Sequence, residues 1–378
     1  MWDQYELSKL LIYEQPTAYI VESTKYDDKY KIPVLTAGKT FILGYTDETT
    51  GIYDNLPVII FDDFTTASQY VNFKFKVKSS AMKILKPNTE LVNPKYIYYR
   101  MQIIQFDSST HKRYWIQQYS KIKVAVPPLE EQARIVARIE ELFSQLESGV
   151  ETLKQTKEQL AVYRQAVLSC AFPELTDTNK KLLVEIADIT GGITKGRHLE
   201  GKDVIELPYL RVANVQDGYL DLSEMKTIQL KSSERDKYLL KNDDVLYTEG
   251  GDRDKLGRGT VWRNEIPECV HQNHIFKARI NQEIAVPQYV AFWSLSKTAR
   301  NYFYSKGKQS VNLASINKTV LSNLPLPIPS IEEQHKTVSE IEDRLSVCDQ
   351  IEQTVDAALQ QAEALRQSIL KKAFEGGL

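Results

Sequence analysis

The sequence has few cysteines, no strong basic excess and no long apolar run, and each of these shortages excludes a class of protein. Cysteine occurs only at Cys170, Cys269 and Cys348, without a Cys-x-x-Cys pair, so we expect reduced thiols in a cytoplasm. No apolar run approaches the roughly 18 residues of a membrane-spanning helix. The N-terminal MWDQYELSKL carries charges where a signal peptide needs an apolar stretch. A net charge of −2 argues against a generally basic coat for nucleic acid.

An internal repeat divides the 378 residues. The motif PPLEEQ at 127–132 returns as PSIEEQ at 329–334, and a shift of 202 residues continues the match without a gap. Ile139 then meets Ile341, and Arg164 meets Arg366. A repeat this long indicates a duplicated domain pair rather than a solenoid.

Charge alternates along the same division. Residues 1–126 and 176–328 each carry a net charge of +3, whereas 127–175 carries −3 and 329–378 carries −5. We therefore expect a first body at 1–126, a central helix at 127–175, a second body at 176–328 and a C-terminal helix at 329–378.

The two acidic segments are predicted to be long helices. In 130–172 the apolar residues recur with the 3.5-residue spacing of a coiled-coil seam, and the second copy keeps the same frame. Proline precedes each segment, and Glu-Glu follows in the first turn, where the helix dipole favours anions. About 43 residues at ~1.5 Å each give a rod of roughly 65 Å. We expect the two helices to pack antiparallel and to hold the bodies apart.

The two bodies are predicted to be mixed α/β. Strand patterns occur at 56–61, 73–77, 244–247 and 275–280, and proline-led helical patterns occur at 93–104 and 286–303. Each body ends in an apolar strand that contains or precedes proline, at 122–126 and 324–328. The predicted fold class is therefore α/β (mixed α+β), with two globular domains separated by two long helices and an internal pseudo-twofold repeat.

Three stretches contain lysine or arginine and no carboxylate: 64–89, 108–129 and 284–331. A phosphate-facing surface needs such a local excess, although an ordinary solvated face also explains it. Polar clusters accompany these stretches: HKRYWIQQ (111–118), GGDRDKLGRG (250–259), HQNH (271–274) and KGKQSVNLASINK (306–318). Arg and Lys read guanine and Asn and Gln read adenine, so we expect contact with DNA, while the same residues are also common in loops.

No complete catalytic or metal site is evident. The run GGITKGRH lacks the lysine and hydroxyl of a phosphate-binding loop. His271 and His274 have HxxH spacing, with Cys269 as the only nearby further ligand. Asp62-Asp63 is a weak match to a metal-dependent nuclease and otherwise reads as a turn. We assign no catalytic and no metal residue, and a coiled-coil nuclease acting on DNA alone is kept as the alternative.

On these residues the chain resembles the specificity (S) subunit of Type I restriction-modification systems. The resemblance rests on the repeated Pro-x-x-Glu-Glu-Gln helix start and on these segments: RQSILKKAFEGGL, TEGGDRDKLGRG, HQNHIF, NLASINKTVL, PVLTAGKTFILGYT, IIFDDFTT and KVKSSAMKIL. It covers essentially the whole chain. The first copy departs from the family pattern, because it ends in SCAFPEL where the family often has a basic pair and glycine.

The resemblance implies that each body is a target recognition domain that reads one half of a split site in double-stranded DNA. The helices would set the unread spacer and dock two modification (M) subunits. S-adenosylmethionine would be bound by M, ATP and Mg by restriction (R) subunits where present, and no cofactor by this chain.

The candidate DNA-contacting residues are Lys39, Thr65, Thr66, Lys78, Ser79, His111, Lys112, Arg113, Tyr114, Lys195, Arg197, Arg253, Lys255, Arg258, Gln272, Asn273, His274, Lys308, Gln309, Asn312, Asn317 and Lys318. The resemblance also marks candidate partner-binding residues on the helices, namely Glu131, Gln132, Arg164, Phe172, Glu333, Gln334, Arg366 and Phe374.

Overall fold

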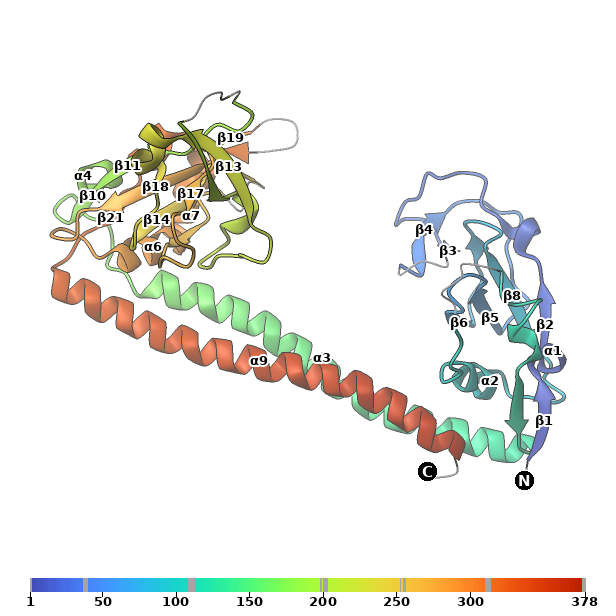
Figure 1. Cartoon of the computed structure of the whole chain (residues 1–378). Helices are drawn as coiled ribbons and strands as arrows, with labels where there is room; N and C mark the ends of the chain where they lie inside the picture. Colours follow the sequence, from blue (N-terminus) through green and yellow to red (C-terminus); the bar gives the residue numbers. More distant parts are fainter. Residues whose placement is uncertain are drawn as a thin grey trace. The chain divides into compact units, whose positions relative to one another are not determined.

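The chain folds into two units that each combine one body with parts of both long helices. The computed structural model describes residues 2–36, 40–107, 113–197, 199, 203–251, 253, 256–309 and 314–375. Unit 1 comprises Met1–Leu153 and Asp356–Leu378, and unit 2 comprises Lys154–Val355. The long helices are α3 (Leu129–Cys170) and α9 (Ile331–Glu375), and both pass from one unit to the other (Figure 1).

The described strands of the first body all precede α3 in the sequence. In chain order its elements are β1 (Asp3–Glu6), α1 (Leu7–Leu10), β2 (Leu11–Glu14), η1 (Pro16–Tyr19), β3 (Ile32–Leu35), β4 (Ile42–Thr46), β5 (Val58–Asp62), β6 (Ser68–Val71), β7 (Lys76–Val77), β8 (Met82–Pro87), α2 (Pro94–Met101), η2 (Tyr119–Lys121) and β9 (Lys123–Val126).

Among the described residues, the second body contains more elements than the first. In chain order they are β10 (Lys180–Leu182), α4 (Leu183–Ile186), β11 (Ala187–Gly191), β12 (Val204–Leu210), η3 (Val212–Asn214), β13 (Lys226–Lys231), η4 (Ser232–Glu234), α5 (Arg235–Tyr238), β14 (Asp244–Thr248), β15 (Gly250–Gly251), β16 (Gly259–Val261), β17 (Val270–His271), β18 (Ile275–Ile280), α6 (Pro287–Leu295), α7 (Lys297–Lys306), β19 (Lys308–Gln309), β20 (Ala314–Ser315), α8 (Lys318–Ser322) and β21 (Pro325–Pro327).

The two bodies share one arrangement of strands. The four-stranded antiparallel sheet is β2-β8-β5-β6 in the first body and β11-β18-β14-β16 in the second. A three-stranded sheet, β4-β3-β7 or β13-β12-β17, joins one antiparallel pair to one parallel pair. A two-stranded sheet, β1-β9 or β10-β21, contains the strand that leads into the following long helix. Because the matching strands also follow the same order along the chain, the bodies are structural repeats, and the predicted fold class is confirmed.

A further sheet distinguishes the second body. Its strand order is β15-β20-β19, with Gly250 opposite Ser315 and Lys308 opposite the same serine. The described part of the first body contains no counterpart of this sheet. The difference between the bodies therefore lies where the two polar clusters around residues 250–259 and 306–318 meet.

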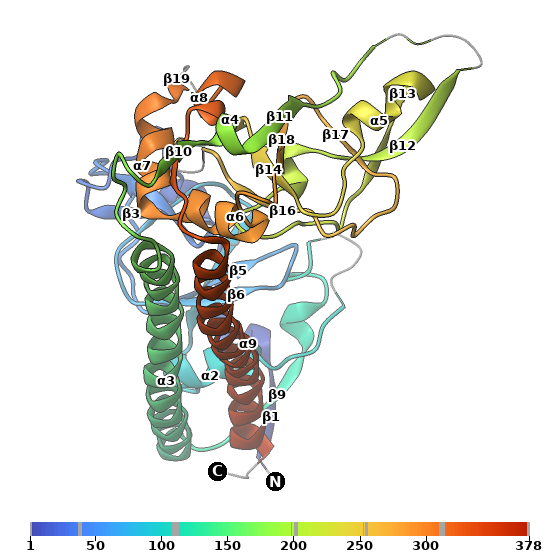
Figure 2. The ribbon, with the colours of Figure 1, turned by 90° about the vertical axis from the view of Figure 1, so that its left-hand side faces the viewer.

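In unit 2, α3 and α9 run antiparallel. Leu168, near the end of α3, shares an apolar cluster with Ile341, near the start of α9. Earlier in α3, Arg164 donates a hydrogen bond to Asp349, which lies later in α9, at 2.7 Å. The contact order on one helix is thus reversed on the other, and Figure 2 shows the two helices side by side.

The core of unit 1 uses both ends of the chain. Phe61 and Leu85 of the central strands share one buried cluster with Ile139 of α3 and with Ile369 and Leu370 of α9. The apolar seam predicted for the helices therefore covers the body as well as the neighbouring helix.

Two predicted elements differ from the structure for local reasons. The pattern at 286–303 predicted one helix, but Ser296 leaves the helical conformation and its hydroxyl accepts from the N–H of Ala299, so that α7 begins anew. The alternation at 73–77 predicted a five-residue strand, whereas β7 has two residues. In β7 the Lys76 side chain points inward, where its ammonium donates to Thr50 O at 2.7 Å and pairs with Glu48.

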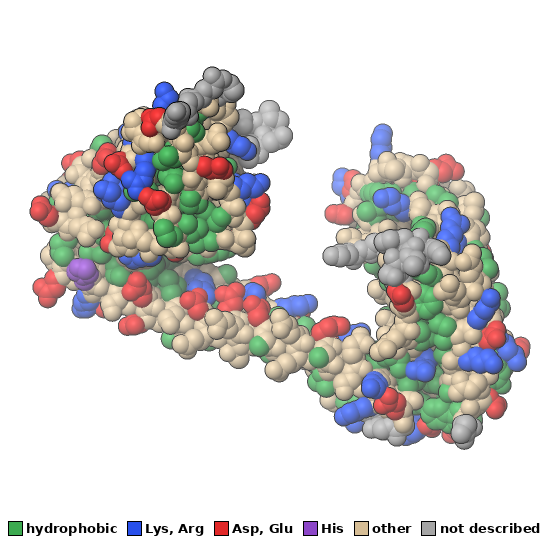
Figure 3. Space-filling model, in the orientation of Figure 1, with side chains coloured by type: hydrophobic (Ala, Val, Ile, Leu, Met, Phe, Trp, Pro, Cys, Tyr) green, Lys and Arg blue, Asp and Glu red, His purple; other side chains and the backbone are tan. Residues whose placement is uncertain are grey.

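Surface charge is mixed. On the face shown in Figure 3, basic and acidic side chains are interspersed over each body. Among the described residues, no helix combines the length and the hydropathy needed to span a membrane.

Candidate functional site

A buried glutamine joins the first turn of each long helix to the body that precedes it. In α3, Gln132 is fully buried. Its carboxamide oxygen accepts from the N–H of Asn93 at 2.7 Å, and its amide nitrogen donates to Leu91 O at 3.1 Å and Pro127 O at 2.8 Å. These partners flank the start of α2, so one side chain joins α2, the end of β9 and α3.

The repeat reproduces this contact in α9. Gln334 is also fully buried, accepts from the N–H of Val286 at 2.8 Å, and donates to Ile284 O at 3.2 Å and Pro329 O at 2.9 Å. The prediction that Gln132 and Gln334 bind a partner subunit is therefore wrong, because neither side chain reaches the surface. We name these two residues the glutamine locks.

The two phenylalanines predicted to bind a partner are partly buried and pack against the body of their own unit. Phe374 meets Tyr96 edge-on with 5.2 Å between ring centroids, and Phe172 meets Tyr289 in the same way at 5.1 Å. Each ring thus attaches the end of one long helix to the body at which the other long helix begins.

The predicted arginines form ion pairs between the helices. Arg164 of α3 donates to Asp349, and Arg366 of α9 donates to Glu147 at 3.3 Å, which are equivalent pairs under the 202-residue shift. Arg366 also lies 4.2 Å from the centroid of the Phe143 ring. Arg164 and Arg366 therefore stabilise helix pairing, and each keeps part of its side chain exposed.

The predicted glutamates stay at the surface. Glu131 pairs with Arg134 of the next turn, and this pairing holds the pKa of Glu131 below its usual value. Glu333 accepts from the N–H and hydroxyl of Ser330, hydrogen bonds that lower its pKa and cap α9.

An apolar groove lies between α3 and α9 in unit 2. Its volume is about 790 Å³, and its lining includes Leu160, Val162, Tyr163, Ala166 and Ile351. Val162 is 71% exposed and Tyr163 is 48% exposed. Contiguous exposed apolar surface of this kind is typical of protein contact sites.

In the first body, the predicted DNA-contacting residues occupy turns. Thr65 and Thr66 follow β5, and Lys78 and Ser79 follow β7. Tyr114 is 1% exposed and its ring meets Phe106 at 5.0 Å, so the prediction that this ring contacts DNA is wrong. Arg113 is exposed. Lys39, His111 and Lys112 lie outside the described residues.

Two lysines of the first basic stretch also face inward. Lys76 and Lys83 have side chains that are 3% and 2% exposed, and they pair with Glu48 and Asp63. The carboxylate-free window at 64–89 therefore overstates the positive charge that this surface offers.

In the second body, several predicted residues already have partners. Arg197 forms a two-pronged pair with Glu234 at 2.8 and 3.1 Å. Arg258 donates to Gln216 at 3.0 Å, and Arg253 lies over the ring of Tyr304 at 4.2 Å.

Other predicted residues of the second body lie near β17–β20. Gln272, Asn273 and His274 connect β17 to β18, and Lys308 is exposed in β19. Asn317 caps α8 by accepting from the N–H of Val320 at 2.9 Å, which gives its side chain a structural role. Lys195 and Lys318 are exposed. Lys255 and Asn312, and the side chain of Gln309, lie outside what the structure describes.

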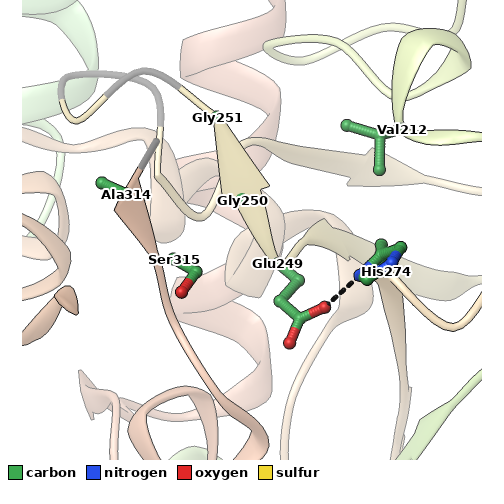
Figure 4. Close-up of a pocket in the computed structure, with 7 residues that line it drawn as sticks. All are labelled: Val212, Glu249, Gly250, Gly251, His274, Ala314 and Ser315. Atoms are coloured by element: carbon green, nitrogen blue, oxygen red, sulfur yellow. Dashed lines mark hydrogen bonds and ion pairs between the residues drawn. The ribbon is translucent and has the colours of Figure 1, made fainter. Parts of the chain in front are cut away.

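Three polar clusters of the second body meet at one cavity, called here the Glu249 cavity. It has a volume of about 510 Å³ and is lined by Val212, Glu249, Gly250, Gly251, His274, Ala314 and Ser315. Figure 4 shows the Glu249 carboxylate and the His274 ring pointing toward one another across a hydrogen bond. The cavity wall opposite is small or apolar. Sequence reasoning selected His274 and missed Glu249, although an acid followed by two glycines at the end of a buried strand was a usable signal.

The arrangement does not favour the metal alternatives. His271 is buried with Nδ1 at 3.0 Å from Tyr238 O, and burial lowers its pKa to about 4. His274 instead faces Glu249. Asp62 accepts from the N–H of Phe64 in a turn. Among the described residues, no group of three or more His, Cys, Asp or Glu side chains is placed to hold a metal ion.

Comparison with known proteins gives consistent matches. A family model described as the type I restriction modification DNA specificity domain matches residues 2–160 and 177–361. The specificity subunit of the type I restriction enzyme EcoR124I/EcoR124II of Escherichia coli is 35% identical over 351 residues, which span 88% of this chain and 84% of that protein. Nothing in the comparisons supports the nuclease alternative.

Solved structures share the fold. A structure described as the basis of complex assembly and conformational transition of the type I R-M system matches with a TM-score of 0.70 at 17% identity, covering 100% of this chain and 98% of that one. The crystal structure of the HsdS subunit from Thermoanaerobacter tengcongensis matches with a TM-score of 0.51 at 17% identity, covering 100% and 97%.

Proposed function

Because this chain belongs to the family of type I restriction modification DNA specificity domains, we propose that it is the non-catalytic specificity subunit of such a system. Each body reads one half of a two-part site in double-stranded DNA. The long helices set the length of the unread spacer and dock two M subunits.

One observation carries the proposal: the two units repeat their scaffold and differ in their exposed loops. The glutamine locks, the Phe172 and Phe374 contacts and the helix-pairing arginines recur, whereas the β15-β20-β19 sheet occurs in the second body only among described residues. A repeated scaffold presents equivalent surfaces to two copies of one partner. Divergent loops suit two half-sites of different sequence.

The apolar groove between α3 and α9 supports docking on the helices. Under the 202-residue shift Tyr163 corresponds to Leu365, and both are about half exposed. We therefore move the expected contact with M from the glutamine locks to Val162, Tyr163, Ile351 and Leu365. Glu131 and Glu333 remain candidates at the surface.

The first test is co-purification of this chain with the methyltransferase encoded beside it, followed by mapping of methylated adenines in DNA by long-read sequencing. We expect a split motif that requires both chains. Methylation that is unchanged without this chain would contradict the proposal. Replacement of Tyr163 by Glu should weaken co-purification, whereas replacement of Gln145 by Glu, an exposed residue of the same helix that does not line the groove, is the matched control.

A second test addresses the spacer. One helical turn of four residues, added to both α3 and α9 where each passes from one unit to the other, lengthens the helices by about 6 Å. Because successive base pairs rise by about 3.4 Å, we expect the unread spacer to grow by one to two base pairs with both half-sites unchanged. An unchanged spacer in an active complex would contradict the role of the helices.

The cofactors follow from the same proposal. S-adenosylmethionine is bound by the M subunits, and ATP and Mg by R subunits where present. The chain works in the cytoplasm, where its three free thiols stay reduced.

A further inference from the structure

On the premise of the proposed function, we infer that Glu249 is a specificity-determining residue of the second body, and that its carboxylate accepts a hydrogen bond from the exocyclic amino group of a cytosine. The inference rests on the Glu249 cavity and on a comparison of this position with its counterpart in the first body.

Asp63 is the counterpart of Glu249. Each follows the central strand of its four-stranded sheet, β5 or β14. The N–H of Asp63 points to Ala81 O at 3.5 Å, and the N–H of Glu249 donates to His274 O at 2.9 Å. The backbone carbonyl oxygens of these two acids also accept equivalent hydrogen bonds. The N–H of Tyr114 donates to Asp63 O at 3.0 Å, and the N–H of Ile316 donates to Glu249 O at 2.8 Å. Two matching pairs of backbone hydrogen bonds therefore place both acids at one position of the shared fold.

In the first body this acid is part of the core. The Asp63 side chain is 3% exposed, accepts from the N–H of Trp115 at 2.8 Å and lies 3.5 Å from the ammonium of Lys83. Those contacts satisfy and neutralise the carboxylate. An acid at this position thus has a sufficient structural role in the first body.

In the second body, phenylalanine stands at the strand position that Lys83 occupies in the first body. Lys83 pairs with Phe61 across the sheet, and the corresponding pair is Phe276 with Tyr247, so an apolar ring stands where the ammonium stood. Glu249 is one methylene longer than Asp63, and its side chain is 29% exposed in the cavity. Its carboxylate contacts the ring of His274, whose own side chain is 53% exposed.

The chemistry of the cavity selects a hydrogen-bond donor. A carboxylate is repelled by DNA phosphates, so a nucleic-acid ligand that contacts Glu249 has to offer it a hydrogen-bond donor. Gly250 and Gly251 carry no side chain and Ala314 and Ser315 carry short ones, so a ligand can approach the backbone closely. Among major-groove edges, cytosine offers an amino donor without an acceptor beside it, whereas guanine and thymine offer acceptors that repel a carboxylate.

The test replaces Glu249 by Gln in the full chain, assembled with the methyltransferase, and maps methylated adenines. Gln keeps the shape and removes the charge, and it pairs with the N6 and N7 of adenine. We expect preference for cytosine over adenine to fall by about tenfold or more at one position of the second half-site, with the first half-site unchanged. Replacement of Glu249 by Asp shortens the side chain to the length of Asp63 and should relax the same position, which provides a second variant.

Two controls separate structural from reading effects. Replacement of the exposed Glu283 by Gln should leave the motif unchanged. Replacement of Asp63 by Asn should lower the melting temperature of unit 1 without relaxing the second half-site. A wild-type complex without a two-part motif would overturn the proposed function itself. A wild-type complex with such a motif, and variants at Glu249 that methylate the same motif at the same relative rates, would overturn the inference about Glu249 alone.

Discussion

Loss of one glutamine lock should loosen one unit and leave the other intact. Replacement of Gln132 by Ala removes three hydrogen bonds and leaves one N–H and two carbonyl oxygens buried without that partner. An unsatisfied buried polar group costs about 1–3 kcal/mol. Allowing for partial relaxation, we expect the first unit to lose about 3–5 kcal/mol of local stability.

Hydrogen exchange read by mass spectrometry measures this loss segment by segment, which a single unfolding free energy for a two-unit chain does not. Amides of α2 should exchange at least about 100-fold faster in the Gln132 variant, since each 1.4 kcal/mol is tenfold. Amides of α6 should be unchanged. Replacement of Gln334 by Ala should give the reverse pattern.

The exposed Gln159 of α3, replaced by Ala, is the matched control and should alter neither segment. An effect below tenfold on α2, or an equal effect on α2 and α6, would refute the structural role of the lock. A variant that fails to bind M while its exchange is unchanged would restore the original prediction that Gln132 contacts the partner.

Three further changes test separate physical terms. Burial depresses the pKa of His271 to about 4, so the unfolded chain binds a proton at this histidine before the folded chain does as pH falls below about 6.5. The contribution to stability is full above that pH and falls by up to about 3 kcal/mol towards pH 4. Thermal melts should show this loss, and the replacement His271→Gln should remove it. Gly149 lies inside α3 with no atom within 4 Å of an added Cβ, so Gly149→Ala should stabilise unit 1 by about 0.5–1 kcal/mol in calorimetry, and a lower melting temperature would contradict the free space. The replacement Arg164→Met removes the ion pairs with Asp349 and Glu352. Because these groups are partly exposed, the loss of folding stability should be about 1 kcal/mol or less and should shrink in 1 M salt. A loss that does not depend on salt would show that packing of the Arg164 side chain dominates.

The repeated helices could be predicted from the sequence because their signals are local. The 3.5-residue period and the flanking prolines predicted a helix at 130–172, and α3 spans Leu129–Cys170. The central strands of the sheets could also be predicted, since the strand predicted at 275–280 coincides with β18. Each of these elements carries its own apolar pattern, which needs no knowledge of distant residues.

The environment of polar residues could not be predicted, because distant segments create it. Gln132 looks like a surface residue in an acidic helix, and only the loop before α2 buries it. Lys83 counts toward the carboxylate-free basic stretch at 64–89 in the sequence. Its buried ion pair with Asp63 in the structure shows that it belongs to the core. The two glycines after Glu249 mark it in the sequence, but the cavity beside it forms only because β15 and β20, more than 60 residues apart, pair there.

The split composition of unit 1 has a consequence for how the protein is made. Unit 2 is one continuous stretch, Lys154–Val355, whereas unit 1 needs Asp356–Leu378 as well as the N-terminal part. During synthesis the first body emerges before the second, but Ile369, Leu370 and Ala373, which belong to its apolar cluster, are translated only after the second body. Until then Ile139 and Phe143 lack these apolar neighbours.

The first body is therefore completed only after the second body has been made. While the second body is being synthesised, the apolar surface around Ile139 and Phe143 of the first unit stays exposed. Exposed apolar surface of this kind favours aggregation or chaperone binding. A ribosome that stops within α9 before Ile369 would release a chain whose first body lacks part of its apolar cluster, far in sequence from the point where translation stopped. Completion of the first body thus depends on the turns of α9 that carry Ile369, Leu370 and Ala373.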